Sequence, residues 1–427
     1  MRWIMGAVAL GCATRGLAAQ QAEVTLEEAV RRALQVQPAM VQARGDARTA
    51  GASLRASMGS FLPTLSTNGS STRAGGTRFD PNRNQIVDLQ ATTTFSASLL
   101  ASLELFDGFR RLSDRSASAA TQDAADAGLV NQRFQVTVTT KQLFYDALAR
   151  DELVRVAAAQ VRRSRQQLQI SVEKLRAGSA TRSDSLRSTV DYGNARIALL
   201  QAQANLASAQ ANLGRQVGVD APVRAVPDST LPALPDTAAL RATALLTAPQ
   251  VLQTESQARA ARAQIGVSRA SYWPSITTSL RSSYSGSEAP WVSTDTYGNG
   301  WSVQFGFSWT LFNGFTRERQ LVSAFVQSDV AAARAADTRR LVNAQLTQQL
   351  AAMATTYEQI EIARSNVAAA TEDLRVQNER YRVGAATILD LLTSQSALTT
   401  AEVNLVQARF NYLIARAQVE ALVGRVL

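Results

Sequence analysis

Residues 301–315 carry the pattern on which the fold depends, and their sequence is WSVQFGFSWTLFNGF. From Trp301 to Leu311 every second residue is large and apolar, while the residues between them are Ser, Gln, Gly and Thr. A strict period of two predicts a β-strand with one apolar face and one polar face. The first half of the chain repeats this pattern, with fewer aromatic residues, between Leu89 and Leu105.

The predicted strands span 62–75, 89–105, 275–285 and 301–312. Alternation alone also fits a half-buried sheet of a soluble protein. Three features favour a membrane sheet: the strand lengths suit a tilted crossing, the stretches 70–88 and 285–300 are polar enough for exposed loops, and tryptophans cluster between Trp273 and Trp309. The side chains that we expect to face outer-membrane lipid are Trp301, Val303, Phe305, Phe307, Trp309 and Leu311.

The chain contains an internal repeat. LFDGF at 105–109 recurs as LFNGF at 311–315, which is 206 residues later, and FLP at 61–63 recurs as YWP at 272–274. A repeat over this length predicts two copies of one structural unit. We therefore expect a first structural repeat over 20–218, a proline-rich linker over 219–236 and a second repeat over 237–427. The 206-residue offset also pairs Glu173, Arg176, Gly178, Thr181, Asp184 and Gly218 with Glu379, Arg382, Gly384, Thr387, Asp390 and Gly424.

Each repeat is predicted to contain a helix, two strands, a very long helix and a return helix. The long helices are expected over 109–177 and 316–383, and the return helices over 181–217 and 387–423, with turns at Gly178 and Gly384. Helices of that length span on the order of 100 Å. Spacings of three and four predict a coiled-coil seam along each long helix. It follows Phe144, Ala147, Asp151, Val154, Ala158, Val161, Arg165, Leu168, Val172 and Leu175, and Leu346, Leu350, Met353, Tyr357, Ile360, Arg364, Val367, Thr371, Leu374, Asn378 and Tyr381.

The amino terminus predicts export. Residues 1–19 contain an early Arg2, a short apolar run and small residues suited to cleavage, which is typical of a signal peptide. The only cysteine, Cys12, lies within it, so it is either removed or lipidated, and no disulfide is expected. After this leader no run of 18 apolar residues occurs, so we expect no hydrophobic transmembrane helix.

Composition argues against an enzyme. The chain contains no histidine, which removes imidazole-based catalysis and metal sites, and it has no nucleotide-binding loop or nucleophile-elbow motif. We expect no catalytic residue, no cofactor and no metal. The formal net charge is +10, but the arginines are spread among acids and glutamines, so nucleic-acid binding is not expected.

One protomer offers only four strands, and a closed barrel needs about eight or more. The chain must therefore assemble with copies of itself, since a sheet edge exposed to lipid would leave backbone groups unpaired. Two copies would give eight strands and three would give twelve. Strand counting alone leaves both open.

The sequence resembles the TolC family of outer-membrane efflux proteins over most of its length. The resemblance rests on the repeat, on RYRVG at 380–384, on TILDLL at 387–392 and on ARFNYL at 408–413. It implies a mainly α protein with membrane β, in which a homotrimer forms a 12-stranded β-barrel continued by a 12-helix periplasmic α-barrel. It also implies a passive exit duct of a tripartite efflux or type I secretion system, in the outer membrane of a Gram-negative-type bacterium, with a periplasmic adaptor and an inner-membrane transporter as partners.

The resemblance also implies a gate at the turns. Tyr381 matches a tyrosine that bonds an aspartate matching Asp184, and Asp390 matches an aspartate ring at the constriction. The turns at Gly178 and Gly384 are the expected docking points for the adaptor. Two gate positions depart from the family, because this chain has Ala386 and Thr393 where an arginine and a second aspartate are expected.

A competing interpretation is a periplasmic coiled-coil adaptor. Such a protein would share the export signal and the long helices, but it would have no use for a lipid-facing strand.

Overall fold

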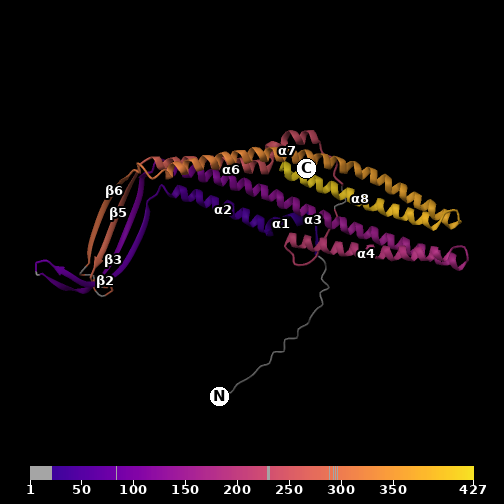
Figure 1. The fold of residues 1–427 in the computed structure, drawn as a ribbon, viewed down its shortest axis with the longest axis horizontal. Helices are drawn as coiled ribbons and strands as arrows, with labels where there is room; N and C mark the ends of the chain where they lie inside the picture. Colours follow the sequence, from indigo (N-terminus) through magenta and orange to yellow (C-terminus); the bar gives the residue numbers. More distant parts are fainter. Residues whose placement is uncertain are drawn as a thin grey trace, which may run out of the picture.

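The computed structural model describes residues 22–82, 84–227, 231–287, 289–291, 293, 295 and 297–427. The expected signal peptide and Cys12 lie outside these residues. The molecule is elongated, with a β-sheet at one end and two helical turns at the other (Figure 1). Among the described residues, no helix is both long and apolar enough to cross a membrane.

The two repeats contain helices of matching length. The long helices α3 and α7 each have 67 residues, and the return helices α4 and α8 each have 36. The first repeat comprises β1 (Ala22–Val24), α1 (Leu26–Val36), α2 (Pro38–Gly59), β2 (Thr64–Asp80), β3 (Gln85–Phe106), α3 (Arg110–Arg176) and α4 (Arg182–Val217). The linker and second repeat comprise β4 (Val223–Ala225), α5 (Thr237–Thr247), α6 (Pro249–Arg269), the 3₁₀ turn η1 (Ala270–Tyr272), β5 (Ser275–Gly286), β6 (Gly298–Ser308), α7 (Thr316–Arg382) and α8 (Ile388–Val423).

The first helix of each repeat is broken by a proline. Pro38 and Pro249 are the first residues of α2 and α6, where the missing N–H of proline costs nothing. The residues before them, Gln37 and Ala248, have ψ of 128° and 114°, because proline excludes its predecessor from the helical region. The single helix that we expected in each repeat is therefore a pair of helices.

The linker contains a strand that the sequence does not reveal. β4 pairs in parallel with β1, and Val24 lies beside Ala225 in the register. Val24 and Val223 are buried with Phe144 and Leu213 in one hydrophobic cluster. Three residues are too few to show a period, and the partner strand lies about 200 residues away. The pair anchors the start of the chain and the linker to the middle of α3.

The four long strands form one antiparallel sheet in the order β2-β3-β5-β6. The β3–β5 pairing joins the two repeats, with Leu99 opposite Ser282 and Ala101 opposite Leu280. The first hairpin is longer than we predicted. Residues 70–88, expected as an exposed loop, continue β2 to Asp80 and begin β3 at Gln85. Their ladder hydrogen bonds come from the backbone, so polar side chains on both faces do not prevent the strand.

The last strand is shorter than we predicted. β6 ends at Ser308, so Trp309 and Leu311 lie after it, in the connection to α7. The indole Nε1 of Trp309 donates to the carbonyl oxygen of Tyr272 at 3.3 Å. The alternation therefore continues past the strand end, where Trp309 and Leu311 are 52 and 69% exposed.

The repeated LFDGF and LFNGF motifs form the junctions between sheet and helices. Gly108 and Phe109 both have positive φ, of 68° and 65°, and Gly314 and Phe315 repeat this with 63° and 61°. Two consecutive left-handed residues turn the chain sharply, and glycine takes the first of them without strain. A Cβ at Gly108 would also lie 2.6 Å from the Ala270 carbonyl oxygen. The motif is therefore a fixed corner.

An arginine locks each corner from the first turn of the long helix. Arg111 lies over the ring of Phe61 at 5.2 Å, and Arg317 lies over the ring of Tyr272 at 4.7 Å. Arg111 also donates to the carbonyl oxygen of Leu105 at the end of β3, and Arg317 donates to that of Leu311, which follows β6. The FLP and YWP motifs therefore recur because each supplies the ring for its arginine.

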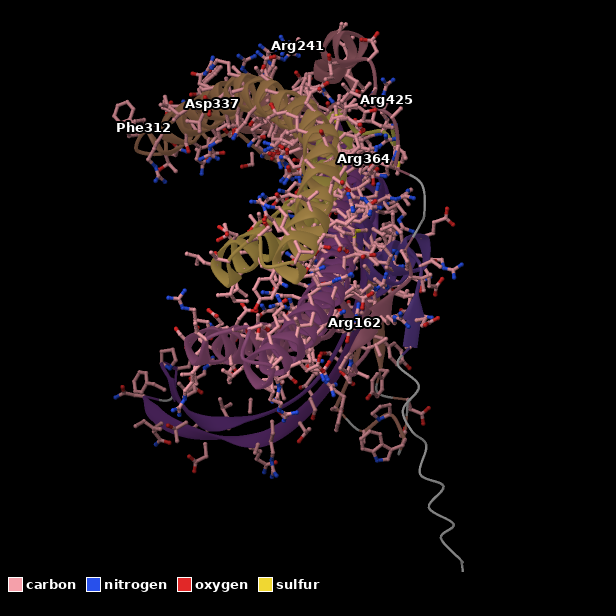
Figure 2. All side chains as sticks on the ribbon, turned by 90° about the vertical axis from the view of Figure 1, so that its right-hand side faces the viewer. Arg162, Arg241, Phe312, Asp337, Arg364 and Arg425 are labelled. Carbon is pink, nitrogen blue, oxygen red and sulfur yellow. The ribbon has the colours of Figure 1, made fainter. Side chains whose placement is uncertain are left out.

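The helices form a curved layer that is four helices wide. Beside the sheet the order is α2, α3, α6, α7, and toward the turns it is α4, α3, α8, α7. Seen from the turns, the helices follow an arc that runs from Asp337 on α7 to Arg162 on α3 (Figure 2). In one copy, α7 therefore forms one edge of the layer throughout, and α2 and α4 form the other.

The seam along α3 differs from the prediction by one residue in its second half. Phe144 and Ala147 are buried as predicted, but further on Ala157, Ser164 and Ser171 are buried rather than Ala158, Arg165 and Val172. The cause is that α3 packs against α4 on one side and α8 on the other, so its buried stripe faces two partners.

Two left-handed glycines provide a matched stability test. We expect Gly218→Ala to lower the thermal unfolding midpoint more than Gly178→Ala. Both have φ near 75°, at 77° and 75°, and share a backbone penalty of about 1–2 kcal/mol. A Cβ at Gly218 would additionally lie 2.8 Å from Val36 Cγ2, whereas nothing lies within 4 Å at Gly178. Far-UV circular dichroism in detergent measures the midpoints, and equal shifts would contradict the crowding argument.

Candidate functional site

The two helical turns lie together at the end of the molecule farthest from the sheet (Figure 1). Gly178 and Gly384 have φ of 75° and 81°, so each ends its long helix in the left-handed conformation. The N–H of Ser179 donates to Lys174 O and that of Ala385 to Arg380 O, both at 2.8 Å. These bonds satisfy carbonyl groups at the helix ends and fix both turns in one shape.

Asp184 and Asp390 each complete a capping box at the start of a return helix. The N–H of Thr181 donates to Asp184 Oδ2 at 3.0 Å, and the Asp184 N–H donates to Thr181 Oγ1 at 3.2 Å. Thr387 and Asp390 make the same pair of bonds at 2.9 and 3.2 Å. Both aspartates thus have a structural role that the sequence shows as a Thr-x-x-Asp spacing and that we did not predict.

Asp390 is exposed and carries its charge over a wide pH range. The hydrogen bond from the Thr387 backbone, followed by that from the Thr387 side chain, lowers the pKa of the Asp390 carboxyl below 3.8. A lowered folded-state pKa means that the charged cap contributes stability above the unfolded pKa and loses it as the pH falls through the folded value. The negative charge at this turn is therefore present at any neutral or mildly acidic pH.

Tyr381 is buried between the repeats rather than bonded to Asp184. Its side chain is 7% exposed and packs in a cluster with Leu374, Ile388 and Leu391, against which Ile170 of the first repeat also packs. Within the described part of the chain the Tyr381 hydroxyl has no hydrogen-bond partner. The single protomer thus lacks the expected bond between Tyr381 and Asp184.

In place of Asp184, Lys174 of the first repeat contacts Tyr381. Its Nζ lies 4.2 Å from the centroid of the Tyr381 ring and also donates to the Tyr381 carbonyl oxygen. The sequence analysis missed this residue, since a lysine in a polar helix gives no signal of its own.

Two further cations of α3 reach the second repeat. Lys141 pairs with Glu420, and Arg163 donates to both carboxylate oxygens of Glu402, at 3.1 and 2.9 Å. Arg163 also lines a pocket of about 350 Å³ between the repeats, together with Tyr381. These bonds tie α3 to α8 along the length that leads to the turns.

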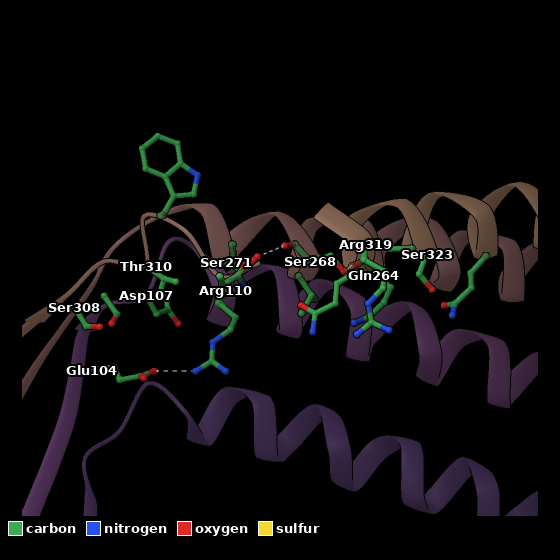
Figure 3. Close-up of a pocket in the computed structure, with 18 residues that line it drawn as sticks. Glu104, Asp107, Arg110, Gln264, Ser268, Ser271, Ser308, Thr310, Arg319 and Ser323 are labelled. Atoms are coloured by element: carbon green, nitrogen blue, oxygen red, sulfur yellow. Dashed lines mark hydrogen bonds and ion pairs between the residues drawn. The ribbon is translucent and has the colours of Figure 1, made fainter. Parts of the chain in front are cut away.

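A polar pocket beside the sheet is lined by acids that form ion pairs. It measures about 690 Å³ and lies where strands meet helices (Figure 3). Its acids are paired, Glu104 with Arg110 at 3.2 Å and Asp107 with Arg111 at 3.0 Å. No group of three potential metal ligands occurs among the described residues. These ion pairs stabilise the junction.

The strand registers sort the sheet into one apolar and one polar face. Ile276 lies opposite Phe307 and Leu280 opposite Val303, so these side chains share a face. Trp301, Val303, Phe305 and Phe307 are 78, 51, 72 and 67% exposed in the single chain. On the other face Ser279 lies opposite Gln304. A surface of exposed aromatic and aliphatic side chains this wide marks an interaction site for lipid or protein.

The family that the sequence matches identifies the class of protein. The family described as "Outer membrane efflux protein" matches residues 29–219 and 240–425. The chain belongs to this family. As a member it is an outer-membrane exit duct for efflux, and the adaptor alternative is wrong.

Relatives and solved structures agree with that assignment. The probable efflux pump outer membrane protein TtgC of Pseudomonas putida is 23% identical over 372 residues, which cover 85% of this chain and 75% of TtgC. The cobalt-zinc-cadmium resistance protein CzcC of Cupriavidus metallidurans is 27% identical over 193 residues, covering 45% of this chain and 46% of CzcC. The Campylobacter jejuni CmeC outer membrane channel has a TM-score of 0.81 at 17% identity, covering 93% of this chain and 85% of CmeC. TtgC is thus named for an efflux pump, CzcC for metal resistance and CmeC for an outer membrane channel.

The capping boxes of this efflux protein can be tested by hydrogen exchange. Thr387→Ala removes the side-chain acceptor for the Asp390 N–H and should destabilise the start of α8 by about 1 kcal/mol. Amide exchange over residues 388–392 should then be roughly fivefold faster. Thr347→Ala is the control, because Thr347 lies inside α7 and bonds only the Asn343 carbonyl oxygen. Unchanged exchange at the start of α8 would rule out the cap.

Proposed function

We propose that this protein works as a homotrimer whose 12 strands close a barrel in the outer membrane and whose 12 helix positions form a periplasmic tunnel. The observation that carries the proposal is that sheet and helical layer are both open on the same two sides. β2 and the α2/α4 edge belong to the first repeat, and β6 and α7 to the second.

Because the two edges of one copy differ, a head-to-tail ring is favoured. The first-repeat edge of one copy meets the second-repeat edge of the next, which is a heterologous contact that closes when the layer is curved. Two copies would give eight strands, whose interior is just wide enough to be filled by side chains. Three copies are therefore the smallest ring that leaves an aqueous bore.

An exposed apolar stripe on α4 supports this contact. Leu186, Val190, Ile197 and Leu200 are 57, 62, 67 and 64% exposed and are spaced by four, seven and three residues. This is the spacing of a coiled-coil seam, yet these four side chains stay exposed among the described residues of one copy. On α7, Ile362 is 60% exposed and offers an apolar counterpart. The stripe is the surface on which α7 of the next copy packs.

The apolar face of the sheet is proposed to contact lipid, with Trp301, Val303, Phe305 and Phe307 as its most aromatic strand. Ser, Thr and Gln side chains on the opposite face then line water. Trp309 and Leu311, which follow the strand, lie at the periplasmic border of the bilayer, where tryptophan is favoured.

The turns at Gly178 and Gly384 are proposed as the closed periplasmic end and as the docking points for an adaptor. TtgC and CzcC are named for an efflux pump and for metal resistance, and by analogy this duct serves an inner-membrane transporter through that adaptor. The chain itself supplies no energy source. The three Asp390 side chains, one from each copy, are proposed to surround the mouth of the tunnel at this end. Asp184 and Tyr381 are proposed to lie farther from the mouth.

The head-to-tail contact predicts a clear assembly defect. Leu200→Asp should convert the trimer to monomers, because each interface loses about 1.5–3 kcal/mol of apolar burial and gains a charge. Size-exclusion chromatography with light scattering in detergent measures the mass. Gln201→Asp is the matched control, since Gln201 is exposed next to Leu200 on the same helix. A trimeric Leu200→Asp protein would contradict the proposed interface.

The aspartate ring predicts altered block by cations. With Asp390→Ala, which removes one charge from each of three copies, divalent and trivalent cations added on the periplasmic side of a planar bilayer should block current at least about tenfold more weakly, since each charge near 4 Å contributes on the order of 1 kcal/mol of attraction in water. Asp337→Ala removes an exposed charge from α7 away from the turn and serves as control. Equal block in wild type and Asp390→Ala would remove Asp390 from the mouth.

A further inference from the structure

We propose that Lys174 is the positioning residue that holds the second-repeat turn against the first repeat, and that it does so through the ring and the main chain of Tyr381. This rests on the proposed closed end at the two turns. The hydroxyl of Tyr381 has no part in it.

The geometry places one cation on two acceptors of one residue. The Lys174 ammonium lies 4.2 Å from the ring centroid, within the range of a cation–π contact, and donates to the carbonyl oxygen of the same tyrosine. Tyr381 is near the end of α7, where carbonyl groups lose their intrahelical partners and the helix dipole is negative. A cation from another helix is favoured at this point.

The Tyr381 ring is buried between the two repeats, with Lys174 reaching it from the first repeat. Tyr381 is 7% exposed, with Leu374 and Leu391 of its own coiled coil in the same cluster and Ile170 of α3 packed against it. Lys174 lies one helical turn beyond Ile170 on α3. The ammonium thus joins the two repeats close to the end of α3, which is Arg176.

Comparison with Lys141 and Arg163, the α3 cations that pair with carboxylates of α8, shows why this contact can open. Lys141, Arg163 and Lys174 lie 22 and 11 residues apart, which is close to whole turns of a helix and keeps them on one face. Lys141 and Arg163 each pair with a carboxylate of α8, and breaking such a partly buried pair leaves an uncompensated charge. Lys174 has no carboxylate in the contact described here, only a ring and a carbonyl oxygen.

Lys174 is half-buried on a flexible stem, so its ammonium can return to water when the turn moves. Separation therefore leaves no buried charge behind. The Lys141–Glu420 and Arg163–Glu402 pairs form the fixed part of the contact between α3 and α8. The Lys174 contact is the part that releases when an adaptor binds the turns.

The test is single-channel conductance of the full-length protein in planar lipid bilayers. Lys174→Met keeps the stem and removes the charge, and we expect the ratio of open to closed channels to rise roughly two- to thirtyfold, the range for losing one cation–π contact. Lys174→Arg should remain closed, because a guanidinium can also lie over the ring. Arg176→Met, which removes an exposed charge two residues away, is the control for a general effect of charge.

Variants of Tyr381 separate this latch from a hydroxyl latch. Tyr381→Phe keeps the ring and carbonyl and should conduct like wild type, whereas Tyr381→Leu should open like Lys174→Met. The Tyr381→Leu variant also covers the case in which Lys174→Met fails to assemble. Wild-type conductance in Lys174→Met, or opening by Tyr381→Phe, would overturn the proposal. If wild type itself forms no channel, the proposed duct fails and the latch fails with it.

Discussion

The unpaired backbone groups along β2 and β6 are the constraint on which the rest of this structure depends. A sheet of four strands has two open edges, and in lipid no water can satisfy their N–H and C=O groups. In the proposed ring, other copies of the chain satisfy them. The helical layer continues both edges away from the sheet, so the contact proposed to close the sheet also closes the proposed tunnel. In that ring, assembly in the membrane and assembly in the periplasm are one event.

The two repeats have matching corners between strand and long helix, but the contacts that each makes with the other differ. At each junction a glycine and a phenylalanine in left-handed conformation turn the chain, and Arg111 or Arg317 lies over an aromatic ring to hold it. Between the repeats, α3 packs against α6 beside the sheet and against α8 toward the turns, because α4 and α7 stand on opposite edges of the layer. The two repeats therefore share the corners that set the direction of the chain, while their contacts with each other differ.

The aspartates at the turns illustrate how one residue can serve two purposes. Asp184 and Asp390 cap their helices, and this explains their spacing from Thr181 and Thr387 without reference to a bore. The cap also fixes a carboxylate in the first turn of each return helix. A ring of such carboxylates requires only that the turns gather around an axis, which is the arrangement proposed for the trimer.

Local signals in the sequence determined the helices and their ends. Prolines start α2 and α6, glycines end α3 and α7, and Thr-x-x-Asp spacings start α4 and α8. Each acts within a few residues, so it can be read from the chain alone, as can the repeat and the alternating strand. The β1–β4 pair, the extension of β2 and β3 and the contact of Lys174 with Tyr381 were decided only by the tertiary structure. They join backbones or side chains brought together by folding, and a polar side chain such as Lys174 carries no sign of which partner it will meet.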